Sequence, residues 1–80
     1  MIKELDQIVL TTDLPEYALQ AGDIGTVVLA HQGGAGYEVE FVALDGETLA
    51  VVSLFAGQVR PVAPREIARA RRIEPHTHAA

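Results

Sequence analysis

Turns that contain glycine or proline divide the first 62 residues into short segments of β-forming residues, and this feature most limits the possible fold. The expected strands cover residues 7–12, 26–31, 37–41, 48–55 and 59–62. No long helix separates them, whereas a parallel pair of strands needs a crossover of about a dozen residues or more. The sequence therefore predicts an all-β fold, a small five-stranded antiparallel barrel that is partly open and protects its edges by curling.

The segment 37–41 shows the clearest alternation in the chain. Its aromatic and aliphatic side chains face one way, whereas Glu38 and Glu40 face the other. This pattern is typical of a strand with one buried and one solvated face.

The segment 48–55 is apolar on both faces. A small barrel covers only one face of a strand. We therefore expect Ala50, Val52 and Leu54 to lie under a C-terminal helix or in a dimer interface, and homo-oligomerisation stays open.

Residues 64–74 differ in kind from the 1–63 barrel domain. Pro64 suits the first position of a helix, and alanine, isoleucine and arginine follow it. We predict an arginine-rich helix over 64–74 and a flexible tail over 75–80. On that helix one face would carry, at spacings of four and three, Arg65, Arg69 and Arg72.

Charge is divided unevenly along the chain. Residues 1–59 carry one base and nine acids, a net charge of −8, whereas residues 60–80 carry five bases and two acids, a net charge of +3. The acidic body repels phosphate backbones, which argues against nucleic-acid binding through the sheet. The basic end can contact RNA, an acidic partner or the acidic body of the same molecule.

The composition excludes several classes of protein. The chain has 80 residues, 49% of them hydrophobic, which suffices for one domain with its own core. No apolar run approaches the roughly 20 residues of a membrane span, and the acids near the N-terminus are unlike a secretory signal. We expect a cytoplasmic protein without membrane contact. Without cysteine it has no disulfide and no thiolate metal site.

No residue pattern predicts catalysis. Glu38 and Glu40 are more simply a solvated strand face than an acid–base pair, and we expect Asp23, between two glycines, to bond the amides of its own turn. His76 and His78 could bind a transition metal, but we interpret them as part of the tail. The sequence therefore predicts no catalytic residue, no metal site and no cofactor.

Three phrases of the sequence resemble small SH3-like barrels. They are Gly22-Asp23-Ile24-Gly25-Thr26-Val27-Val28, Tyr37-Glu38-Val39-Glu40-Phe41 and Val59-Arg60-Pro61-Val62. Similar phrases occur in the KOW modules of ribosome and transcription proteins, in one of the proteins of photosystem I and in the nitrile hydratase β chain. This resemblance implies a fold and carries little information on function.

A closer resemblance covers about residues 5–62. Besides parts of these phrases, it includes Asp6, Val9-Leu10, Asp13-Leu14-Pro15 and Leu19. On these residues the chain is similar to the small bacterial family called domain of unknown function 4926. The resemblance implies a stand-alone SH3-like barrel with no known activity, and it points to neighbours in toxin–antitoxin-like gene pairs.

From these observations we predict a non-enzymatic protein-binding module. Its acidic face, centred on Glu38, Glu40 and Glu47, would engage a basic protein, in an antitoxin-like or accessory role beside the product of an adjacent gene.

Two alternatives stay open. One is a KOW-like module that binds RNA or the ribosome through Arg60, Arg65, Arg69 and Arg72. The other is an accessory subunit of a larger enzyme.

Overall fold

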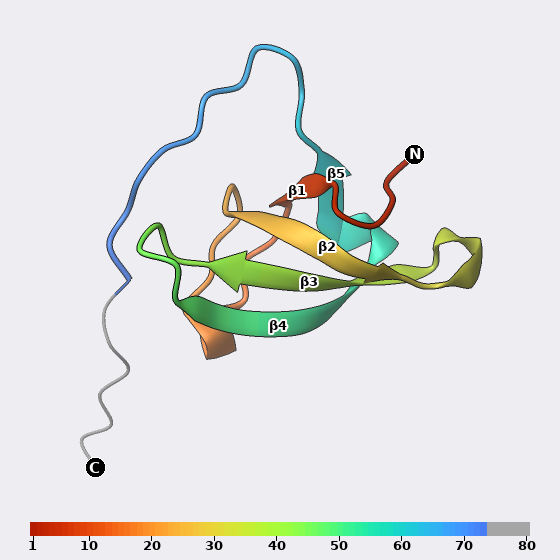
Figure 1. The fold of residues 1–80 in the computed structure, drawn as a ribbon, viewed down its shortest axis with the longest axis horizontal. Helices are drawn as coiled ribbons and strands as arrows, with labels where there is room; N and C mark the ends of the chain where they lie inside the picture. The colour runs from red at the N-terminus through yellow and green to blue at the C-terminus, as the bar shows by residue number, and fades with distance from the viewer. Residues whose placement is uncertain (74–80) are drawn as a thin grey trace.

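The computed structural model describes residues 1–73, which form a single five-stranded antiparallel sheet (Figure 1). The strands are β1 (Gln7–Leu10), β2 (Ile24–Ala30), β3 (Gly36–Val42), β4 (Thr48–Phe55) and β5 (Val59–Pro61), with one-turn 3₁₀ helices η1 (Pro15–Tyr17), η2 (Gln32–Gly34) and η3 (Ala56–Gln58). Their order across the sheet is β4-β3-β2-β1-β5, and no pairing of β4 with β5 closes it within residues 1–73. The predicted all-β, antiparallel architecture is confirmed.

β2 pairs with β1 near its start and with β3 along the rest of its length, and it contains a bulge. It pairs with β1 through residues 24–26 and with β3 through residues 26–30, and the register with β3 shifts between Val27 and Leu29. Because a bulge adds one residue and increases the local twist, Val28 and Leu29 are both exposed, although they are consecutive.

The core lies on the inner face of the sheet. Its most deeply buried side chains are Ile8, Leu10, Val27, Val39 and Phe41. The last two come from β3, together with the buried Tyr37, so the alternation predicted for this strand is confirmed.

The core buries the face of β4 that we expected to lie under a helix or in a dimer interface, so that expectation is wrong. Val52 and Leu54 are only 5% and 4% exposed and belong to the core, with Ala50 packed against it. The reason is the register: Val52 lies opposite Val39 and Leu54 opposite Tyr37, and directly opposed residues of antiparallel strands share a face. The exposed apolar residues of β4 are Leu49, Val51 and Phe55.

The helix predicted over 64–74 is wrong for its described part, residues 64–73. After β5 the chain turns at Pro64 and then runs without helix as an arc beside the sheet (Figure 1); we call residues 62–73 the C-terminal segment. A helix of this length is marginal in water unless an apolar face packs on something, and Ile67 is 92% exposed. Residue 74 and the predicted tail lie outside the described residues. No helix within residues 1–73 is long and apolar enough to cross a membrane.

Candidate interaction surface

The side of the sheet opposite the core combines two glutamates with exposed apolar side chains. Glu38 and Glu40, on β3, are half-buried, whereas Val51 and Phe55 on β4 are 56% and 77% exposed. We call this side the outer face and define it by Leu29, Glu38, Glu40, Val51, Ser53 and Phe55. Exposed apolar residues beside charged ones are typical of protein interaction sites.

Neighbouring side chains hold both carboxylates in place. Ser53 Oγ donates to Glu38 Oε1 at 2.6 Å, and His31 Nε2 lies 2.8 Å from Glu38 Oε2. Thr48 Oγ1 donates to Glu40 Oε2 at 2.7 Å. The hydrogen bonds from Ser53 and then His31 lower the pKa of Glu38, so the outer face presents a charged, oriented carboxylate at neutral pH.

The partners of Glu38 and Glu40 could not be recognised in the sequence. His31 and Ser53 lie seven and fifteen residues from Glu38 along the chain, and only the pairing of β3 with β4 places Ser53 opposite Glu38. A correct register would have found Ser53, but neither residue belongs to a recognisable motif.

Glu47 lies apart from the other two predicted acids. It belongs to the β3–β4 turn, where its N–H donates to Asp45 Oδ1 at 3.0 Å and its carbonyl accepts the Ala43 N–H. The structure therefore brings together Glu38 and Glu40 but places Glu47 at the tip of the hairpin.

Asp23 bonds within its own turn, as expected. Its Oδ2 accepts the Gln20 N–H at 2.8 Å. It also pairs with Arg71, whose Nε donates to Asp23 Oδ1 at 2.9 Å and whose Nη2 donates both to Asp23 Oδ2 and to the Ala18 carbonyl. Arg71 thus ties the end of the C-terminal segment to the acidic body.

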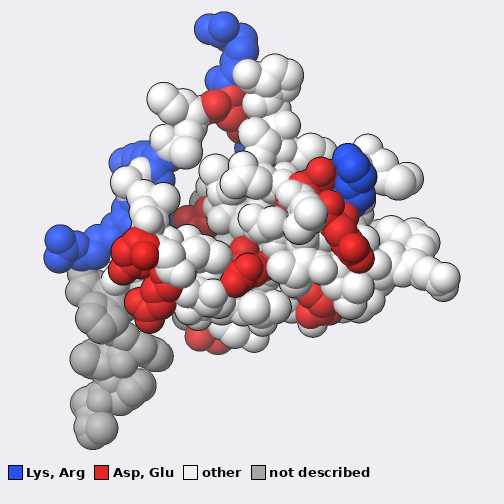
Figure 2. All heavy atoms as spheres, viewed as in Figure 1, with Lys and Arg blue, Asp and Glu red and all other residues white. Residues whose placement is uncertain are grey.

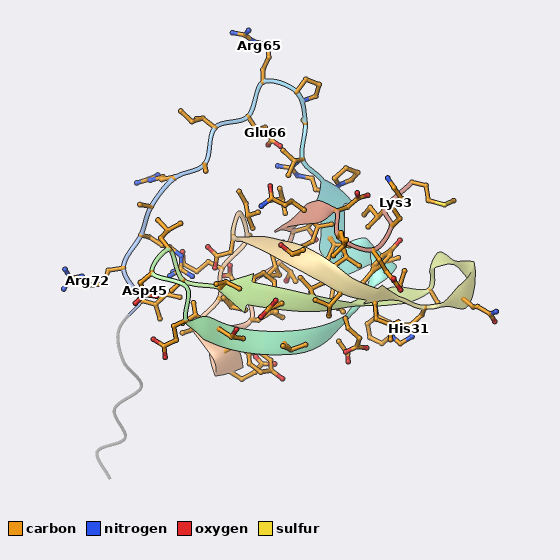
Figure 3. The ribbon with its side chains drawn as sticks, in the orientation of Figure 1. Lys3, His31, Asp45, Arg65, Glu66 and Arg72 are labelled. Atoms are coloured by element: carbon orange, nitrogen blue, oxygen red, sulfur yellow. The ribbon has the colours of Figure 1, made fainter. Side chains whose placement is uncertain are left out.

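The basic residues are concentrated along the C-terminal segment, away from most of the acids (Figure 2). Because the segment is not helical, Arg65, Arg69 and Arg72 do not share a helical face, and that prediction is wrong. Arg65 lies at the top of the arc and Arg72 near its lower end (Figure 3). None of the three forms an ion pair within residues 1–73, whereas Arg60 pairs with Glu66 at 2.5 Å.

The ion pair with Arg60 should make the Glu66 carboxyl titrate at an unusually low pH. The hydrogen bond from Arg60, and next the one from the Ala63 N–H, lower the pKa of Glu66 from its usual 4.5 to about 2. The contribution of this pair to holding the turn at Pro64 is thus complete above pH 4.5 and is lost as the pH falls toward 2. We expect the Glu66 carboxyl ¹³C shift to titrate near pH 2 and to titrate at a higher pH in Arg60→Ala, still below the usual value because the hydrogen bond from the Ala63 N–H remains.

Arg65→Ala is the matched control for this titration. It removes an arginine next to Glu66 but keeps both partners of the pair. Glu66 should therefore titrate as in the unchanged chain. A midpoint near 4.5 in the unchanged chain would contradict the pair.

A groove that the sequence did not indicate separates the C-terminal segment from the β3–β4 hairpin. Its volume is about 640 Å³, and its lining includes Ile24, Val42, Leu44, Ile67, Arg69 and Ile73. Within residues 1–73 no group of three or more His, Cys, Asp or Glu side chains could hold a metal ion. His76 and His78 lie outside the described residues.

Most of the chain matches one known protein family. The family described as Domain of unknown function (DUF4926) matches residues 4–61, a span that contains all five strands and excludes the C-terminal segment. No curated protein and no solved structure matches the chain. The resemblance found in the sequence is confirmed, and the chain belongs to the DUF4926 family.

Proposed function

We propose that this domain is a non-enzymatic protein-binding module of the cytoplasm whose outer face engages a basic protein. The observation that carries the proposal is the pair of oriented carboxylates, Glu38 and Glu40, beside exposed Val51 and Phe55. Complementary charge speeds the encounter and selects the partner, while a large apolar side chain such as Phe55 supplies the buried area that holds a complex together. If the partner is an enzyme, the domain is its accessory subunit.

The strand order supports an SH3-like barrel as the scaffold for this face. β1 pairs with both β2 and β5, while β2, β3 and β4 form a meander bent at the β2 bulge. We propose that this is the partly open barrel expected from the strand pattern, with the SH3-like fold that the resemblance implies.

Reversing the charge of both glutamates tests the proposal. The tagged chain captures its basic partner from nuclease-treated native lysate, and the purified partner is then titrated against variants. We expect Glu38→Lys/Glu40→Lys to abolish the complex, because two attractive charges become repulsive. The domain should stay folded in thermal unfolding, because the core on the other face is untouched. The hydrogen bonds to the two carboxylates are lost, which should cost about 0.5–1.5 kcal/mol each at most.

The matched control is Glu4→Lys/Glu16→Lys. It makes the same change in net charge at exposed residues outside the strands. We expect it to keep the complex. Binding retained by Glu38→Lys/Glu40→Lys would refute the proposal.

The exposed arginines favour one second candidate, an RNA-binding module of the KOW type. Arg65, Arg69 and Arg72 have no ion pair within residues 1–73, so they are available for phosphates. Retention on RNA should then fall steeply between low and physiological salt, because binding releases counterions. The absence of any RNA complex at low salt would exclude this candidate.

A further inference from the structure

β4 is an edge strand without the usual protection. It has eight residues and, within residues 1–73, pairs only with β3. Figure 1 shows it as the outermost strand at its end of the sheet. Its sequence, Thr48 to Phe55, contains no charged residue and no proline. Natural proteins normally protect such an edge with charges, proline or a covering segment, because its unpaired backbone groups can bind another strand.

The available backbone groups belong to Val51 and Ser53. Antiparallel strands direct the N–H and C=O of alternate residues to opposite sides. The Ala56 N–H points to β3 and donates to the Ala35 carbonyl at 3.1 Å, whereas the Phe55 N–H is bound by Gln58 Oε1 at 2.8 Å. Val51 and Ser53 alternate with Phe55 and therefore direct their groups away from β3, with no such side chain to bind them within residues 1–73.

We infer that this edge binds an extended segment of the partner, with Lys or Arg at alternate positions, as an added strand. This inference rests on the proposed function and specifies its partner. Ser53 and Val51 lie opposite Glu38 and Glu40, so a residue of the added strand lies about 4.8 Å beyond them. A long basic side chain there reaches across the small Ser53 to the Glu38 carboxylate.

Charge favours a basic segment of a partner over a second copy of the chain as the strand that binds this edge. Residues 1–59 carry a net charge of −8, and Asp45 and Glu47 lie in the turn that precedes β4. Two β4 edges brought together would bring two acidic bodies together, whereas a basic strand offsets that charge.

The test uses the full chain, labelled with ¹⁵N, and the peptide acetyl-Lys-Val-Lys-Val-Lys-Val-Lys-amide. We expect binding to shift the amide signals of Val51 and Ser53 and to slow their hydrogen exchange. The control is the same peptide N-methylated at every residue, which keeps its charges but cannot donate to the edge. It should bind at least tenfold more weakly, since two or more backbone hydrogen bonds are lost.

The outcomes separate this inference from the proposed function. Equal binding of both peptides, or no binding, overturns the edge pairing and leaves the outer face to be tested by its own partner. In a third outcome, the N-methylated peptide binds more weakly, but the unmethylated peptide binds Glu38→Lys/Glu40→Lys as tightly as the unchanged chain. This outcome supports the edge pairing and overturns the selection of basic residues by the glutamates. Shifts at Val51 and Ser53 that follow protein concentration without peptide show a second copy on the edge and also overturn the inference.

Discussion

Phe41→Ala should cost the domain about 3–5 kcal/mol of its free energy of unfolding, the usual loss on truncating a buried aromatic side chain. Phe41 is 2% exposed and is among the largest fully buried side chains. The whole free energy of unfolding of a small domain is only about 5–15 kcal/mol. The variant should therefore unfold at a much lower urea concentration, and circular dichroism measures this unfolding.

Phe55→Ala makes the same chemical change on the other side of the sheet. Phe55 is 77% exposed, so the free energy of unfolding should change by no more than about 0.5 kcal/mol, while binding of the basic partner should weaken. Equal losses of stability in the two variants would contradict the assignment of inner and outer faces.

Gly25→Ala should destabilise the domain by about 1–3 kcal/mol through overpacking. A Cβ atom at this position would lie 2.5 Å from Val39 Cγ1 and 2.8 Å from Phe41 Cε1. Gly25 does not have the left-handed backbone that Gly22 has, with its φ of 98°, so the lack of space is the whole reason for glycine here. Urea unfolding again measures the loss.

Two further variants check this explanation. Gly57→Ala adds the same methyl group where no atom lies within 4 Å, and it should leave the domain as stable as before. In a Val39→Ala background, Gly25→Ala should cost less, because the nearest clashing atom has gone and neighbouring substitutions are not additive. A cost that does not depend on Val39 would exclude the contact with Val39 as the cause and leave only the contact with Phe41.

The two glycines of the Gly22-Asp23-Ile24-Gly25 phrase show how far local sequence can be interpreted. The phrase correctly predicted a turn that enters a strand, because Gly22 adopts a conformation that other residues avoid. The need for Gly25 came from β3, whose side chains are brought against it by pairing at a distance along the chain. A single sequence cannot distinguish these two reasons.

The C-terminal segment is a case in which local sequence led to a wrong prediction. Helix propensity is local and predicted a helix over residues 64–74, but propensity alone stabilises a short helix only weakly. The Arg60–Glu66 pair and the pairing of Arg71 with Asp23, 48 residues away, accompany an extended path instead. The family match also stops where this segment begins, since it ends at residue 61.

The sequence by itself determined that the chain is all-β and antiparallel and that Glu38 and Glu40 share the solvated face of one strand, because alternation and turn chemistry act over a few residues. Only the tertiary structure decided which apolar face of β4 is buried. β4 has no alternation of its own, so its orientation follows from its register with β3. That same register places Ser53 beside Glu38 and leaves Val51 and Phe55 exposed.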